Sequence, residues 1–213
     1  MTYERLVEDA AARCLSVVGA FHPTPDDRLG PARTVVLLGP GEPGFWAHVS
    51  QEPEFQDGAH DPMDRWSRRV IEGWADTLNA QPLFPFGHPQ RPFLSFAMRS
   101  GRAWSSPLGM LVHDTVGLMV SYRGALALRQ HLDIPEPSEQ PCGACQAPCK
   151  TACPIGALSG EGYDVPACKA FVGSEAGVDC RTQGCIARRA CPISKTYPRA
   201  PGQSAYHMEV FLG

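Results

Sequence analysis

The stretch Cys142-Gly-Ala-Cys145-Gln-Ala-Pro-Cys149-Lys-Thr-Ala-Cys153-Pro154 places four cysteines within twelve residues. A second series follows, made of Cys168, Cys180, Cys185 and Cys191, the last of which again precedes a proline. Of the nine cysteines in the chain, only Cys14 lies outside this region. The N-terminus has neither the basic segment nor the apolar core of a signal peptide, so we expect a cytoplasmic protein. In that compartment, clustered cysteines indicate a metal site rather than a disulfide framework.

The spacing of these cysteines is typical of iron–sulfur ligation. Closely spaced thiolates on a turn can hold three corners of an iron–sulfur cube, and a cysteine just before a proline serves a second cluster. The region resembles the two-cluster bacterial ferredoxin module, whose run is Cys-x2-Cys-x2-Cys-x3-Cys-Pro. It is also similar to the ferredoxin module of epoxyqueuosine reductase, which pairs two Cys-Pro motifs across a long stretch. The resemblance implies two [4Fe–4S] clusters, the first held by Cys142, Cys145, Cys149 and Cys191 and the second by Cys153, Cys168, Cys180 and Cys185.

The spacing departs from the ferredoxin run in two places. Three residues instead of two precede Cys149, and the second series is stretched to gaps of four and five residues. Two four-cysteine zinc sites are therefore an alternative, although zinc ribbons usually pair two Cys-x2-Cys knuckles and this region contains one. Disulfides are a further alternative. For Cys14 we predict a buried, unreactive thiol.

Length and charge limit the remaining possibilities. The chain has 213 residues, is 43% hydrophobic and carries a formal net charge of −3. This charge argues against nucleic acid as a partner, and no apolar run reaches the length of a membrane span. Residues 133–141 contain three prolines without periodicity and are predicted to link two domains. The predicted organisation is an N-terminal domain over 1–132, this linker, and an iron–sulfur module over 142–213.

The N-terminal domain shows both helical and strand patterns. Residues 3–18 follow the i, i+3, i+4 pattern of an amphipathic helix with Cys14 on its apolar face, and Thr34–Leu38 is predicted as a buried strand ahead of a tight turn at Gly39–Gly44. Asp61 and Pro62 predict the start of a helix, with Asp61 as its N-cap and an apolar stripe formed by Met63, Trp66, Val70, Trp74 and Leu78. We further predict a short strand over 93–98 and a β-hairpin that joins 109–113 to 117–122.

Several short motifs of this domain resemble one family. They are Ala20-Phe21-His22-Pro23 followed by Thr34–Leu38, Asp61-Pro62-Met63-Asp64, and Gly109-Met-Leu-Val-His113 followed by Gly117-Leu-Met-Val-Ser-Tyr-Arg123-Gly124. Together they are similar to the CblC-type cobalamin-processing proteins, which remove the upper ligand of a corrinoid on a nitroreductase-like fold. The resemblance implies an α+β N-terminal domain with His113 and Arg123 as cofactor-binding residues near the corrinoid, and His22 as a weaker match. It assigns no catalytic residue.

The two resemblances together predict a redox protein. A small bacterial-ferredoxin-like module with two [4Fe–4S] clusters would pass single electrons to cobalamin or a similar small-molecule cofactor in the N-terminal domain. The alternatives are a non-catalytic electron carrier and a flavin-using reductase, although no flavin-phosphate site is evident. Five basic side chains lie among the ligands and would compensate cluster charge, dock an acidic protein redox partner, or simply be solvated: Lys150, Lys169, Arg181, Arg188 and Arg189.

Overall fold

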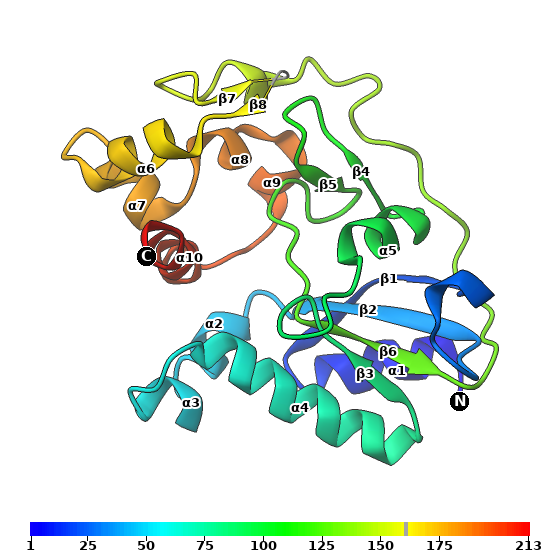
Figure 1. The fold of residues 1–213 in the computed structure, drawn as a ribbon. Helices are drawn as coiled ribbons and strands as arrows, with labels where there is room; N and C mark the ends of the chain where they lie inside the picture. Colours follow the sequence, from blue (N-terminus) through cyan, green and yellow to red (C-terminus); the bar gives the residue numbers. More distant parts are fainter. Residues whose placement is uncertain (160–161) are drawn as a thin grey trace. The chain divides into compact units, whose positions relative to one another are not determined.

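The computed structural model describes residues 1–159 and 162–213, which form the mixed helix-and-sheet arrangement in Figure 1. This confirms the α+β class. The chain divides into two compact units, the first made of Met1–Arg102 and Ser121–Ser138 and the second of Ala103–Val120 and Glu139–Gly213. The predicted N-terminal domain, 1–132, thus includes a segment that the structure groups with the cysteines. In the described part of the chain, no helix combines the length and apolarity needed to span a membrane.

A four-stranded antiparallel sheet forms the centre of the first unit. Its order is β1 (Leu15–Phe21), β2 (Thr34–Pro40), β6 (Gly124–Leu128) and β3 (Gln81–Leu83). Every residue of β2 and β6 is buried. Strands buried on both faces read as continuous apolar runs, so Thr34–Leu38 was predictable and is confirmed as a strand.

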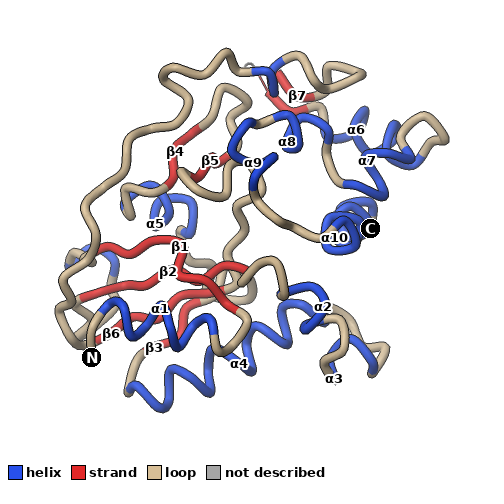
Figure 2. Tube along the Cα trace, turned by 180° about the vertical axis from the view of Figure 1, so that it is seen from behind, coloured by secondary structure: helices blue, strands red, loops and turns tan. Residues whose placement is uncertain are grey.

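Helices cover both faces of this sheet. In Figures 1 and 2, α1 (Tyr3–Ala11) and α4 (Pro62–Leu78) lie on one face and α5 (Phe93–Arg99) lies on the other. The predicted helix after Asp61 is confirmed, and its inward face includes Trp66 and Trp74. Asp61 itself adopts a left-handed conformation, and its side chain makes no capping hydrogen bond. The remaining short helices of the unit are η1 (Pro25–Asp27), α2 (Phe45–Val49) and α3 (Pro53–Gln56).

The helix predicted over 3–18 is wrong beyond Ala11. The chain turns at Cys14, whose φ of 55° is left-handed, and Leu15–Phe21 continues as β1. Cys14 is therefore a half-buried turn residue whose carbonyl oxygen accepts a hydrogen bond from Gly41 N at 2.9 Å. Further along β1, a bulge between Val17 and Ala20 contains Gly19. A Cβ on Gly19 would lie 2.6 Å from Ser100 Oγ, so this close approach requires glycine.

The strand predicted over 93–98 is a helix, α5. Phe93, Phe96 and Ala97 are buried, whereas Leu94 is 67% exposed. The buried positions follow the i, i+3, i+4 spacing of a helix instead of the alternation of a strand. The apolar composition of this short segment suggested a strand, and its periodicity identifies the helix.

The second unit is mostly helical. Its helices are η2 (Pro148–Lys150), α6 (Val165–Gly173), α7 (Val178–Gln183), α8 (Ile186–Ala190), α9 (Pro192–Thr196) and α10 (Pro201–Leu212). Two small antiparallel pairs complete it, β4 (Ala103–Ser105) with β5 (Leu111–His113), and β7 (Leu158–Ser159) with β8 (Gly162–Tyr163).

The hairpin predicted between 109–113 and 117–122 is wrong in its pairing. Strand β5 pairs with β4, and His113 at its end forms an isolated antiparallel bridge with Gly117. The next residue, Leu118, donates a 2.8 Å hydrogen bond from its backbone N to Ser194 Oγ at α9. This contact anchors the segment 103–120 to the cysteine region.

Candidate functional site

Four cysteines of the second unit line one cavity. They are Cys153, Cys168, Cys180 and Cys185, and they come from the loop after η2, from α6, from α7 and from the start of α8. The rest of the wall is almost entirely apolar, with side chains such as Phe171, Val172 and Ile186. This arrangement presents thiols around a dry space, as the ligands of a metal–sulfur centre require.

The electrostatics of this cavity disfavour ionised thiols. Burial raises the pKa of Cys180 above its usual value, and a negative charge on neighbouring Cys185 raises it further. Burial likewise raises the pKa of Cys168, with charges on Cys185 and Cys153 adding to the effect. Four thiolates in one apolar cavity therefore need a positively charged partner such as iron or zinc.

A second group consists of Cys142, Cys145, Cys149 and Cys191. Burial is the largest cause of the raised pKa of the Cys142 thiol, and negative charges on Cys145, Cys149 and Cys191 raise it further. Cys149 and Cys191 are buried in an apolar cluster with Leu108, Val112 and Leu118 of the segment 103–120. Ala147 N also lies 3.4 Å from Cys145 Sγ and donates to it.

The cavity thus contains the four cysteines of the second predicted set. Cys142, Cys149 and Cys191 of the first set pack in one apolar cluster, against which Cys153 and Cys185 also pack, while Cys14 belongs to the first unit. The role of the two sets as ligands stays a prediction. Within residues 1–159 and 162–213, no three His, Cys, Asp or Glu side chains converge closely enough to hold a single metal ion.

Tyr163 ends β8 near the second set and was not singled out by the sequence. Burial raises the pKa of the Tyr163 phenol, and the nearby Cys168 thiol raises it further. The only signal in the sequence was a tyrosine five residues before a cysteine, which indicates nothing without the intervening turn.

Three of the five basic residues among the cysteines have partners within the second unit. Arg181 Nη1 donates to Val172 O at 2.7 Å, and Lys169 Nζ donates to Leu212 O at 3.1 Å. Arg189 pairs with Asp179 and donates from Nε to Gly184 O at 3.0 Å. These side chains hold helices together, in addition to placing positive charge near the thiols.

His113 is completely buried in the second unit. Its Nδ1 lies 2.8 Å from Asp114 Oδ1 and 3.2 Å from both the backbone N and the Oγ1 of Thr115. Its backbone pairs with Gly117 through two 3.0 Å hydrogen bonds. The imidazole is therefore oriented by the turn that follows β5.

Arg123 lies in the first unit, just before β6. Its backbone N donates to Leu38 O at 2.7 Å, and its Nη1 lies 3.5 Å from Asp64 Oδ1 in the first turn of α4. Burial raises the pKa of Asp64 despite the nearby guanidinium. The structure thus assigns the two predicted cofactor residues to different units, and it gives each of them contacts within its own unit.

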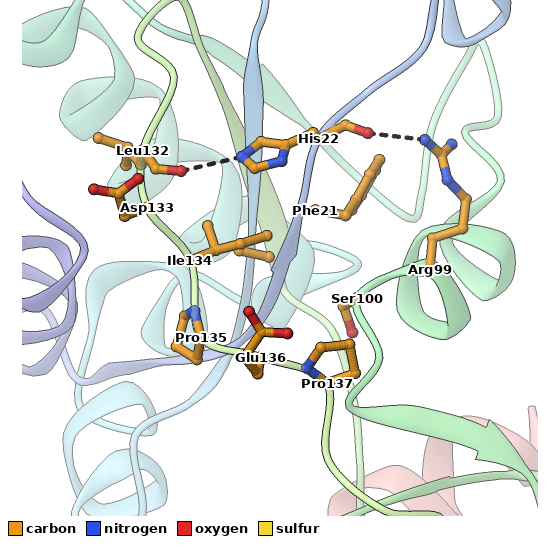
Figure 3. A pocket seen from close by; sticks show the side chains of 11 residues that line it. Phe21, His22, Arg99, Ser100, Leu132, Asp133, Ile134, Pro135, Glu136 and Pro137 are labelled. Carbon is orange, nitrogen blue, oxygen red and sulfur yellow. Dashed lines mark hydrogen bonds between the residues drawn. The ribbon is translucent and has the colours of Figure 1, made fainter.

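A cavity of about 620 Å³ lies at the end of β1 and includes His22, the weaker match. Figure 3 shows His22 Nε2 paired with Leu132 O, at 3.0 Å, and the carbonyl of His22 accepting from Arg99 Nη2, at 3.2 Å. The predicted linker forms one wall through residues 133–137. In Figure 3 the carboxylate of Glu136 points into the cavity, whose size suits a small ligand.

Comparisons with known proteins find similarity in structure alone. No protein-family model matches the chain, and no curated protein matches it in sequence. The chain resembles the epoxyqueuosine reductase of Streptococcus thermophilus at a TM-score of 0.54 and 15% identity, over 94% of this chain and 68% of that one. An epoxyqueuosine reductase bound to an epoxyqueuosine-modified tRNA-Tyr stem loop gives 0.53 and 15%, over 94% and 69%. A selenomethionine-labelled epoxyqueuosine reductase gives 0.51 and 16%, over 95% and 68%.

The second of these neighbours corrects one prediction. A protein of similar fold holds a tRNA stem loop, so the exclusion of nucleic acid from a net charge of −3 was not justified. Net charge averages over the whole surface, whereas a nucleic acid needs only a local group of basic side chains.

Proposed function

We propose that this chain is an iron–sulfur redox protein that carries two [4Fe–4S] clusters, one on each set of four cysteines. The observation that carries the proposal is the grouping of eight cysteines, distant by up to 49 residues in sequence, into two sets of four. The fold similarity to epoxyqueuosine reductases, over more than nine-tenths of this chain, supports a redox enzyme of that kind.

The residues present suit such clusters. Each set offers four thiols, and thiolate ligation is the usual mode for [4Fe–4S] clusters. When bound, the clusters would supply one-electron transfer. The protein's own contribution is a dry wall: Phe171 and Val172 at the second set, and Leu108 and Val112 at the first. Excluding water around sulfur ligands is one way in which a protein tunes their potential.

The acceptor that we propose is a corrinoid, with His113 and Arg123 as the residues that bind it and a cytoplasmic, reducing setting. The resemblance to CblC-type proteins supports this acceptor. An imidazole can approach the metal of a corrinoid, and a guanidinium can hold its amide or phosphate groups. A non-catalytic carrier and a flavin-using reductase are the alternatives.

Anaerobic metal analysis tests the cluster proposal. Wild-type protein should be brown and contain roughly 8 iron and 8 sulfide per chain. Cys168→Ser should lose about half of the iron, because it removes one ligand of the second set. Cys14→Ser is the matched control and should retain all of it, since Cys14 belongs to neither set. Colourless protein with stoichiometric zinc, or equal iron loss in both variants, would overturn the proposal.

Hydroxocobalamin tests the acceptor. Binding should shift its visible spectrum and raise the unfolding temperature of the protein. Arg123→Met should weaken binding, whereas Arg65→Met, which removes an arginine of α4 that pairs with Asp57, should not. An unchanged spectrum at high excess of ligand would favour the non-catalytic electron carrier. A yellow protein that releases flavin would favour the flavin-using reductase.

The neighbour with a bound stem loop supports a second candidate, a reductase that acts on a modified tRNA. This chain corresponds to about two-thirds of the length of those neighbours. Fluorescence anisotropy with a labelled tRNA-Tyr stem loop tests it at two salt concentrations. Saturable, salt-sensitive binding would support the candidate, and no binding at low salt would contradict it.

A further inference from the structure

The cavity at the end of β1 lies within the first unit, and one of its walls is fixed at both ends. That wall is the segment 133–137. Before it, Leu132 is buried, and its carbonyl oxygen accepts from His22 Nε2 at 3.0 Å. After it, Ser138 N donates to Gly101 O at 3.0 Å. The cavity of about 620 Å³ is therefore preformed, and its volume falls in the range of small-molecule sites.

Arg99 lines this cavity, but its positive charge is already paired. Its Nη1 donates to Asp27 Oδ1 at 2.5 Å, and its Nη2 donates to His22 O at 3.2 Å, the second contact being drawn in Figure 3. The guanidinium carbon also lies 4.4 Å from the centroid of the Phe21 ring. These contacts compensate the charge and direct both terminal nitrogens to groups of the protein. Arg99 therefore gives the cavity little attraction for an anion.

The polar groups that remain available in the lining are hydrogen-bond acceptors. Figure 3 shows the carboxylate of Glu136 pointing into the cavity, and Asp133 supplies a second carboxylate. Among the residues that the structure describes, neither carboxylate has a hydrogen-bond or ion-pair partner. His22 Nε2 must carry a hydrogen, because its partner is a carbonyl oxygen, so Nδ1 of the neutral ring is an acceptor as well.

Apolar side chains form much of the rest of the lining. Ile134, Pro135 and Pro137 contribute them from the segment 133–137, and Phe21 contributes its ring from β1 (Figure 3). The two prolines have no N–H group, so the backbone offers no donor at these positions. The lining therefore combines negative charge and acceptors with apolar surface.

We propose that this cavity binds a small organic cation, in which a protonated amine is joined to an apolar group. The amine would donate to the carboxylates of Glu136 and Asp133, and hydrogen bonds between two charged groups are the stronger ones. The apolar group would pack on Ile134, Pro135 and Pro137. A carboxylate or phosphate ligand would instead meet two negative charges. The site is independent of the proposed clusters and of His113 and Arg123.

Two probes that differ in charge alone test the proposal on the complete chain. Tryptamine and indole-3-propionate share an indole ring and a short chain, and they end in an amine and a carboxylate. Isothermal titration calorimetry should show saturable binding of one tryptamine per chain and no binding of indole-3-propionate. No saturable binding of tryptamine, or equal affinity for both probes, would overturn the inference.

A matched pair of variants locates the site. Glu136→Gln keeps the shape of the side chain and removes its charge, so tryptamine should bind about tenfold more weakly. Asp26→Asn is the control, because Asp26 is exposed on η1, makes the same change in charge and does not line the cavity. An equal loss of affinity in both variants would contradict the assignment. The assay needs no cluster, so a wild type without iron would contradict the proposed function and leave this result unchanged.

Discussion

Gly117 lies where the segment 103–120 meets α9, and Gly117→Ala is expected to weaken that junction. Gly117 has a φ of 62°, and an added Cβ would lie 2.6 Å from both the N and the Oγ of Ser194. The left-handed conformation costs an alanine about 1–2 kcal/mol. Displacing the backbone of Ser194 costs about 1–3 kcal/mol more, since α9 begins only two residues earlier at Pro192. We therefore expect a loss of about 2–5 kcal/mol in unfolding free energy.

Gly109→Ala separates the two contributions. Gly109 has a φ of 73°, but nothing lies within 4 Å of an added Cβ. This variant should lose only the conformational part, about 1–2 kcal/mol. Urea unfolding of both variants measures the difference, and iron content reports on Cys191, three residues from Ser194. Equal losses in both variants, with iron unchanged, would refute the assignment of 103–120 to the cysteine region.

Three further substitutions test the first unit. Asp27 accepts a hydrogen bond from Arg99 Nη1 at 2.5 Å, and this contact lowers the pKa of its carboxyl. Asp27→Asn should therefore cost about 1 kcal/mol in unfolding free energy at pH 7. Its urea midpoint should approach that of the wild type as the pH falls below 3.8, the ordinary pKa of an aspartate, because the wild-type carboxyl then becomes protonated. Burial raises the pKa of Asp64, so the contribution of this carboxyl to stability should fall as the pH rises past its ordinary pKa of 3.8, and the stability difference between Asp64→Asn and the wild type should change over that range. Trp66→Ala should cost about 3–5 kcal/mol in the same assay because the indole is fully buried.

The sequence predicted best those elements whose signals are strong and local. Thr34–Leu38 is an apolar run bounded by turn residues, and 62–78 begins with Asp-Pro and carries a long amphipathic stripe. In 3–18, by contrast, the helical spacing of apolar residues continues into β1. The left-handed turn at Cys14 that separates the two elements has no glycine or proline to mark it.

The sequence did not predict which atoms would be the hydrogen-bond and ion-pair partners of individual side chains. His113 and Arg123 were selected by resemblance, and the structure gives His113 contacts with Asp114 and Thr115 and gives Arg123 a contact with Asp64. The contacts of His113 are with the next two residues in the sequence, but Arg123 and Asp64 lie 59 positions apart. Periodicity describes faces of elements, and it carries no information on which polar atoms meet.

The segment 103–120 precedes the cysteine region in the sequence but belongs to the same structural unit. Its apolar side chains Leu108, Val112 and Leu118 pack with Cys149 and Cys191, so part of the shield around the first cysteine set precedes the cysteines by some thirty residues. A fragment that begins at residue 142 would lack these side chains and expose the two buried sulfurs to water. Because solvent exposure of sulfur ligands changes their potential, the proposed cluster of the first set would have a potential that depends on residues which the sequence grouped with the other domain.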